Sequence, residues 1–252
     1  RQLNYSFNYI GAENIKTIYD DEHTALRLIS NVDGFGDGTD GSYNSKTSLT
    51  LNPVFNEYTG TLDDDTADTF DDWTIYSAGT GRTEAVTGEI GGVAMKATQT
   101  DATASAQYRG VMQTRTLAEL GLSVGDVISA QTSYKMSAQT TAAVNIYFRF
   151  RNVATTVISN HYMVSSATAE VSDYTVVKQE GVIIPADTGD IQFFAYIRAS
   201  DAYAGQTNQL WVDYLFCEEA ASCSAIEEHN ITTFGVATED ATSVIRQYRD
   251  FI

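Results

Sequence analysis

The chain has 252 residues, 43% of them hydrophobic and 19% charged, which is the composition of a folded protein large enough to bury a core without a metal ion. Its 33 acidic residues outnumber the 15 basic ones and give a formal net charge of −18, which repels phosphate backbones and anionic lipid. No run approaches the roughly 18 apolar residues of a membrane-spanning helix. We therefore expect neither nucleic-acid binding nor membrane insertion.

Residues 1–47 are predicted to form an N-terminal arm. They comprise the aromatic start RQLNYSFNYI, a helical pattern around DDEHTALRLIS, and the acidic, glycine-rich loop NVDGFGDGTDGSYNS. Asp33, Asp37 and Asp40 of this loop could supply oxygen ligands to calcium. The EF-hand pattern fails, however, because Phe35 falls on a ligand position when Asn31 is taken as the first. A turn-rich loop is the favoured interpretation.

Residues 48–219 are predicted to form one all-β domain, an antiparallel two-sheet jelly-roll β-sandwich. Apolar residues alternate with polar ones in most of its segments, and the crossover helices of a parallel sheet are missing. The only helical turn expected is TLAEL at 116–120. The predicted strands are 48–55, 71–77, 91–97, 105–114, 127–137, 142–151, 155–165, 173–184, 190–198 and 210–216.

Two strands make the face of each residue explicit. AAVNIYFRFR (142–151) places Val144, Ile146, Phe148 and Phe150 on one face, opposite Asn145, Tyr147, Arg149 and Arg151. By the same rule, LWVDYLF (210–216) places Leu210, Val212, Tyr214 and Phe216 opposite Trp211, Asp213 and Leu215. An acid thus stands in the middle of an apolar strand.

Residues 220–252 are predicted to form a C-terminal arm with a terminal helix, because Val244, Ile245, Tyr248 and Ile252 follow a helical stripe. Cys217 and Cys223 lie close enough in sequence for a disulfide. The spacing permits that bond and does not require it, so the pairing stays open.

A set of landmarks between 51 and 219 carries a family resemblance. LNPVFNEYTG and DDWTIY contain Asn52, Phe55, Trp73 and Thr74; GGVAMKA, YRGVMQT, GLSVGDVISAQTSYKM and LWVDYLFCEE follow in order. This order resembles the carbohydrate-binding-module jelly rolls of the galactose-binding-like superfamily, especially xylan- and glucan-binding modules. It is also similar to domains of bacteriophage tail, fibre and head-decoration proteins.

The resemblance implies a structural calcium ion, held by the acid on the last strand and by the acid that ends the first. Here these positions are Asp213 and Asn56, with Glu57 one place later, so an amide stands where the family has its acid. Calcium needs 6 to 8 oxygen ligands. The alternative is that Asp213 accepts hydrogen bonds from loop amides or points to solvent.

Sugar binding is the activity that the sequence favours, because pyranose rings stack on aromatic side chains. Tyr134, Tyr147, Arg149 and Tyr196 are the candidate carbohydrate-binding residues. Packing in the sandwich is the alternative role for each tyrosine. Both tryptophans, Trp73 and Trp211, are expected in the core. No catalytic motif occurs and the histidines are scattered, so we expect no enzyme activity.

The role expected is that of a non-catalytic structural or adhesive protein of a virion or other extracellular assembly. Its partners would be other copies of itself, other virion or surface proteins, and cell-surface polysaccharide. One alternative is a glycan-binding module that is accessory to a secreted polysaccharide-degrading enzyme. Another is a polysaccharide-cleaving jelly-roll enzyme, which would need clustered carboxyl groups or a Tyr/His/Arg set in one cleft.

Overall fold

The structure, a computed structural model, describes residues 48–89 and 92–223. From Leu49 on, these residues belong to one compact unit, Leu49–Ser224. The predicted N-terminal arm (1–47) and the helix predicted in the C-terminal arm lie outside the described residues.

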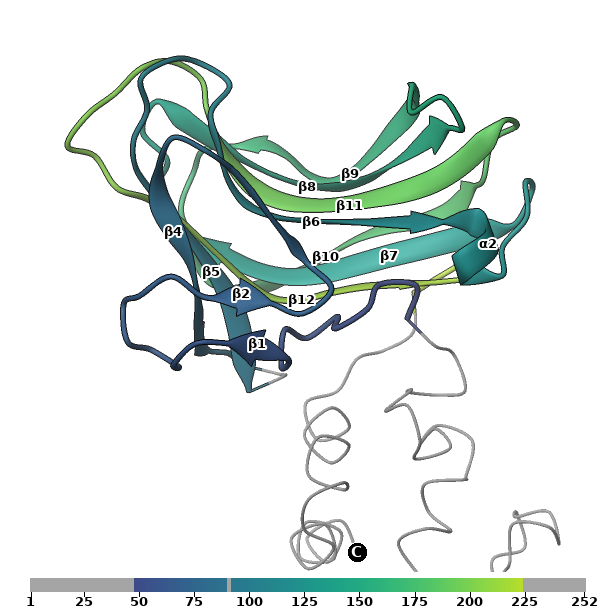
Figure 1. Ribbon diagram of the computed structural model, residues 1–252, viewed down its shortest axis with the longest axis horizontal. Helices are drawn as coiled ribbons and strands as arrows, with labels where there is room; N and C mark the ends of the chain where they lie inside the picture. Colours follow the sequence, from purple (N-terminus) through teal and green to yellow (C-terminus); the bar gives the residue numbers. More distant parts are fainter. Residues whose placement is uncertain (1–47, 90–91, 224–252) are drawn as a thin grey trace, which may run out of the picture. The chain divides into compact units, whose positions relative to one another are not determined.

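Two five-stranded sheets face each other (Figure 1). One, which we call the concave sheet, has the order β3 (Thr74–Ala78), β6 (Tyr108–Thr116), β11 (Thr188–Ala199), β8 (Ala142–Asn152) and β9 (Val157–Ala167). The opposite sheet has the order β10 (Val171–Ile183), β7 (Val127–Met136), β12 (Asn208–Glu218), β5 (Val93–Asp101) and β4 (Thr80–Thr87). A short ribbon joins β1 (Tyr58–Thr59) to β2 (Thr69–Phe70), and α2 (Leu117–Leu120) follows β6.

All neighbouring strands pair antiparallel, which confirms the predicted all-β, two-sheet sandwich. The jelly-roll connectivity stays a prediction. The strands β6, β11, β8 and β9 curve, and the concave side of their backbone faces away from the opposite sheet (Figure 1). No helix in the part of the chain that the structure describes is long and apolar enough to cross a membrane.

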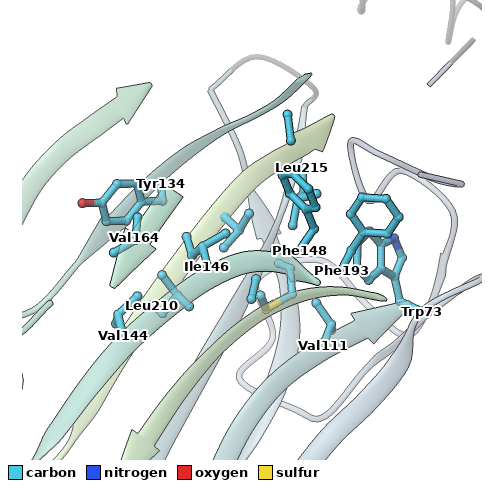
Figure 2. Packing of buried hydrophobic residues seen from close by; sticks show 14 of the residues in the cluster. Trp73, Val111, Tyr134, Val144, Ile146, Phe148, Val164, Phe193, Leu210 and Leu215 are labelled. Atoms are coloured by element: carbon cyan, nitrogen blue, oxygen red, sulfur yellow. The ribbon is translucent and has the colours of Figure 1, made fainter. Parts of the chain in front are cut away.

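The core lies between the sheets and follows the period-two pattern of the strands. On β8 the predicted inner residues Val144, Ile146, Phe148 and Phe150 are all fully buried. Phe193 of β11 meets Phe148 at a ring distance of 6.3 Å. Figure 2 shows both side chains in this core, together with Leu210 and Leu215 of β12. Burial of such side chains stabilises the fold by about 1.5–3 kcal/mol each.

The segment that carries the family landmarks begins as an irregular chain rather than a strand. Residues 49–53 run beside the end of β12, where the Leu49 amide donates to the Cys217 carbonyl (2.6 Å) and the Leu215 amide donates to the Pro53 carbonyl (2.8 Å). Trp73 is buried, as predicted, and its Nε1 donates to the Asn52 carbonyl (3.1 Å). The first and last segments of the domain are therefore neighbours.

The predicted alternation of LWVDYLF is wrong beyond Val212. A β-bulge lies between Val212 and Tyr214, so the register to β7 shifts by one residue. Leu215 therefore joins Leu210 and Val212 in the core, while Tyr214 pairs with the outward Ser133 of β7. The extra residue is Asp213, which is fully buried.

In the two five-stranded sheets, β4 was not predicted, because TGRTEAVT reads as polar. Its Glu84 is nevertheless buried and pairs with Lys96 of β5 (2.5 Å) and with Arg82 (2.8 Å). The carboxylate of Asp68 accepts from the Ala85 amide at the outer edge of β4 (2.7 Å). The ion pairs of Glu84 and the hydrogen bond from Ala85 to Asp68 thus allow a sequence with charged residues to form a partly buried edge strand.

Gly110 of β6 is the position where a side chain conflicts most directly with the concave sheet. A Cβ there would lie 2.1 Å from the Ala195 carbonyl oxygen and 2.6 Å from the Tyr196 Cα, both on β11. We expect Gly110→Ala to lower the free energy of unfolding by about 1–3 kcal/mol, measured by urea denaturation. Ser77→Ala on exposed β3 serves as the control. Equal stability of Gly110→Ala and the natural chain would contradict the described contact.

Candidate functional site

Three of the four predicted sugar-binding residues lie together. Tyr147 and Arg149 of β8 and Tyr196 of β11 all point outward from the concave sheet, on the face away from the core. We call this surface the tyrosine face. Tyr134 of β7 is not part of it. It belongs to the core between the sheets, where Figure 2 shows it near Val164.

The prediction that Tyr134 binds sugar was wrong because it ignored the face of the strand on which this residue lies. It shares its face of β7 with Ile128, Ala130 and Met136, all buried in the core. Its ring fills space between the two sheets, and burial raises the pKa of its phenol. The pattern of VISAQTSYKM already placed it on the apolar side of the strand.

An aromatic row crosses the middle of the tyrosine face. The strand register sets Tyr147 opposite both Phe194 of β11 and Tyr162 of β9. The rings of Tyr147 and Phe194 are stacked, with centroids 4.8 Å apart and planes 12° apart. Tyr162 packs on the other side of Tyr147, also at 4.8 Å. Tyr162 is the exposed member, at 41% relative exposure, so its ring is open to a ligand.

A second group of rings continues the row toward β3. Tyr76 and Tyr108 are stacked at 4.8 Å, and each meets Tyr196 edge to face, at 5.3 Å and 5.6 Å. The Tyr147 and Tyr196 rings also meet edge to face, with centroids 6.1 Å apart.

A polar row runs beside the aromatic row. Arg149 stands opposite Gln192 of β11 and Asn160 of β9. Its Nε donates to the Gln192 Oε1 (2.8 Å), and the Gln192 Nε2 donates to the Thr114 hydroxyl of β6 (2.8 Å). The Arg149 guanidinium also lies over the Phe194 ring, 4.7 Å from its centroid. Hydrogen bonds and a cation–π contact thus fix the direction of this side chain.

An ion pair lies at one end of the tyrosine face, next to Arg149 and Gln192 on β8 and β11. Arg151 donates through Nε and a terminal nitrogen to the two carboxylate oxygens of Asp190, at 2.9 Å and 2.7 Å. Both side chains are mostly buried, at 17% and 13% exposure. This fork-to-fork geometry neutralises both charges. The pair holds β8 to β11 and leaves Arg149 as the charge beside the aromatic row.

The arrangement suits recognition of a sugar. An exposed ring can stack on a pyranose face, and the adjacent amide, guanidinium and phenol groups can bond its hydroxyls. Sequence reasoning missed Phe194, Tyr162, Tyr76, Tyr108 and Gln192. The signal was present for Gln192 and Phe194, because both share the strand face of Tyr196 in DIQFFAYIR.

The residues of the predicted calcium site are placed differently. The Oδ1 of buried Asp213 accepts from the Glu89 amide in the turn between β4 and β5 (2.8 Å). Asn56 and Glu57 are exposed, and the Glu57 carbonyl accepts from the Asn52 side chain. Among residues 48–89 and 92–223, no three His, Cys, Asp or Glu side chains group as a metal site. Calcium binding by Asn56, Glu57 and Asp213 stays a prediction.

The other predicted positions divide between core and surface. Trp211 was expected in the core but is partly exposed on the outer face of the opposite sheet, where it stands opposite Lys96 of β5 and Lys135 of β7. The Nζ atoms of Lys96 and Lys135 lie 5.8 Å and 5.3 Å from its ring centroid. The Trp211 ring therefore makes cation–π contacts with both lysines.

Of the two cysteines, Cys217 is buried and Cys223 is half-buried.

No family model matches the chain, and no curated protein matches it. Similar solved structures include the C-terminal family 22 carbohydrate-binding module of a Clostridium thermocellum protein (12% identity, 62% of this chain, 91% of that chain, TM-score 0.43). The CBM22-1 xylan-binding domain from Paenibacillus barcinonensis is another (8%, 64%, 92%, 0.39). The enzymatically active domain of bacteriophage CBA120 tailspike protein 4 also matches (9%, 60%, 0.40), and the match spans 20% of that chain.

Asp213 is expected to stabilise the domain through its buried hydrogen bond. Asp213→Ala leaves the Glu89 amide without this acceptor, so we expect a loss of about 1–3 kcal/mol in the free energy of unfolding, measured by urea denaturation in EDTA. Asp213→Asn keeps an acceptor oxygen and should lose less. The opposite result would be that added Ca²⁺ stabilises the natural chain but not Asp213→Asn. That result would show that Asp213 binds calcium.

Tyr196 makes the stability of the domain sensitive to alkali. Burial, and then the neighbouring Tyr147, raises the pKa of Tyr196 above its ordinary value of 10.0. The folded state therefore favours the neutral phenol. This contribution is complete below about pH 10 and is lost as the pH rises toward the folded pKa.

We expect the free energy of unfolding to fall above about pH 10, and to fall less steeply in Tyr196→Phe. The measurement is a series of urea denaturations between about pH 8 and 11. The slope attributable to one phenol is at most about 1.4 kcal/mol per pH unit. Identical slopes for the natural chain and Tyr196→Phe would exclude this origin.

Proposed function

We propose that the chain binds a glycan on the tyrosine face of the concave sheet. One observation carries this proposal: the aromatic row (Phe194, Tyr147, Tyr162) lies directly beside the hydrogen-bonded polar row (Thr114, Gln192, Arg149, Asn160). A sugar ring offers an apolar face and a rim of hydroxyls, and the two rows match these two requirements. Both rows lie on the side of the sheet toward which its strands curve (Figure 1).

Binding without cleavage is part of the proposal. A glycosidase needs two carboxyl groups across the scissile bond, about 5–10 Å apart. The five strands of the concave sheet contain one acid, Asp190, and it is tied to Arg151 by two hydrogen bonds. The tyrosine face thus has the groups that hold a sugar and lacks, on its own strands, a carboxyl pair.

We place this binding outside the cell or on a virion surface, where polysaccharides are the ligands available to a protein of this kind. A glycan-binding module joined to a secreted polysaccharide-degrading enzyme and an adhesive part of a virion would both use the tyrosine face. The structural role in a virion, with other copies or other virion proteins as partners, stays a prediction from the sequence.

Tyr162 is the residue whose loss should show the function most cleanly. It is exposed and lies at the rim of the aromatic row, so Tyr162→Ala removes a stacking ring with little effect on the core. We expect glycan affinity to fall about tenfold, equivalent to about 1.4 kcal/mol, in calorimetric titration with a polysaccharide selected on a glycan array.

Val176→Ala, at an exposed position of β10 on the opposite sheet, is the matched control and should keep the affinity of the natural chain. Thermal melting of both variants checks that they are folded. Unchanged binding by Tyr162→Ala, or no glycan bound by the natural chain, would refute the proposal.

A further inference from the structure

The concave sheet has a charge opposite to that of the chain as a whole. The chain carries a formal net charge of −18. The five strands of the concave sheet nevertheless contain a single acid, Asp190, and five arginines: Arg109, Arg115, Arg149, Arg151 and Arg198. The strands of the opposite sheet carry more acids than bases. Positive charge is thus concentrated on the sheet that holds the tyrosine face.

Most of these arginines are committed elsewhere. Arg151 is neutralised by Asp190, and Arg115 lies 3.8 Å from Glu119. Arg109 donates to the Gly79 carbonyl (2.7 Å). Arg198 is exposed at the far end of β11, beyond Tyr196. Within the described ranges, no carboxylate lies within ion-pair distance of Arg149.

Arg149 is held in a position to receive a carboxylate. Its Nε donates to Gln192 and its guanidinium lies over the Phe194 ring, so the rotation of the side chain is restricted. The two terminal nitrogens remain for a ligand, because no hydrogen bond within the described residues uses them. A planar guanidinium binds a carboxylate through two parallel hydrogen bonds, and a preorganised one loses little entropy in doing so.

We propose that the glycan bound on the tyrosine face is acidic, with a uronic acid residue whose carboxylate binds Arg149 while a neighbouring sugar ring packs on Tyr162. This inference rests on the proposed function and adds the class of ligand. The chain's overall negative charge repels dense polyanions at long range. The matching ligand is therefore a polymer in which isolated uronic acids stand among neutral sugars, because one arginine neutralises one carboxylate at a time.

The test compares one polymer in two chemical states. The probes are a xylan that bears glucuronic acid side groups and the same xylan after its carboxyl groups are reduced to alcohols, each titrated calorimetrically into the full chain. We expect the reduced polymer to bind about tenfold to a hundredfold more weakly, as for the loss of a charge-assisted hydrogen-bonded pair. Arg149→Gln should lower affinity for the acidic polymer by a similar factor and lower affinity for the reduced polymer less, so that the variant loses most of the preference for the acidic polymer.

Lys178→Gln makes the same change in net charge on exposed β10 of the opposite sheet, and it should keep the preference of the natural chain. Arg149→Lys keeps the charge without the planar fork, and it should fall between the natural chain and Arg149→Gln. Thermal melting identifies any variant that does not fold, and the comparison of the two polymers on the natural chain stands without the variants.

Each remaining outcome has one meaning. Equal binding of the two polymers by the natural chain overturns the acidic ligand and leaves the proposed function intact. Equal weakening of both polymers by Arg149→Gln would make Arg149 a positioning residue for Phe194 and Gln192, which also overturns the inference. If neither polymer binds and no glycan binds on an array, the proposed function and the inference fail together.

Discussion

The register between β8 and β11 is the constraint on which the rest of the structure depends. It places Phe148 opposite Phe193 on the inner face and Tyr147 opposite Phe194 on the outer face. Arg149 falls opposite Gln192 in the same ladder. A slip of one residue would exchange the two faces of a strand and bring Arg149 and Tyr147 into the core. The stability of the sandwich and the composition of the tyrosine face therefore have the same cause.

The strands β8 and β11 are unusual for an antiparallel sandwich, because apolar side chains cover both of their faces. The inner side chains belong to the main core, whereas Tyr147, Phe194 and Tyr196 form a separate buried cluster outside. A sheet with one solvated face has no need of this second cluster. Next to this cluster, the Arg149 guanidinium lies over Phe194, and the Arg151–Asp190 ion pair follows on the same face of the two strands.

The sequence predicted most of this where alternation was strong and failed where geometry depended on contacts between distant segments. AAVNIYFRFR gave the correct faces for Tyr147 and Arg149, because a regular strand fixes them locally. Tyr134 was grouped with them by residue type, although its own strand pattern already assigned it to the apolar side. LWVDYLF failed at Asp213 because a bulge depends on the partner strand and on the Glu89 amide, neither of which a single strand reveals.

The charges are distributed unevenly between the two sheets, and the strands of the concave sheet carry more basic than acidic residues. From a net charge of −18 alone we expected no dense polyanionic partner such as nucleic acid. That conclusion concerns the long-range field, which an approaching polymer meets first. Binding is decided at contact distance, where the strands around Arg149 carry one acid, already paired with Arg151.

A protein can therefore repel dense polyanions and still hold a single carboxylate on one face. The two effects act over different ranges, because salt screens exposed charges beyond about 8–10 Å while a bidentate contact is made at about 2.7–2.9 Å. For the acidic glycan that we propose, the contrast between a negative net charge and an arginine fixed beside aromatic rings would discriminate among polymers by the spacing of their charges. Polymers with widely separated carboxylates can satisfy Arg149 without bringing further negative charge against the rest of the domain.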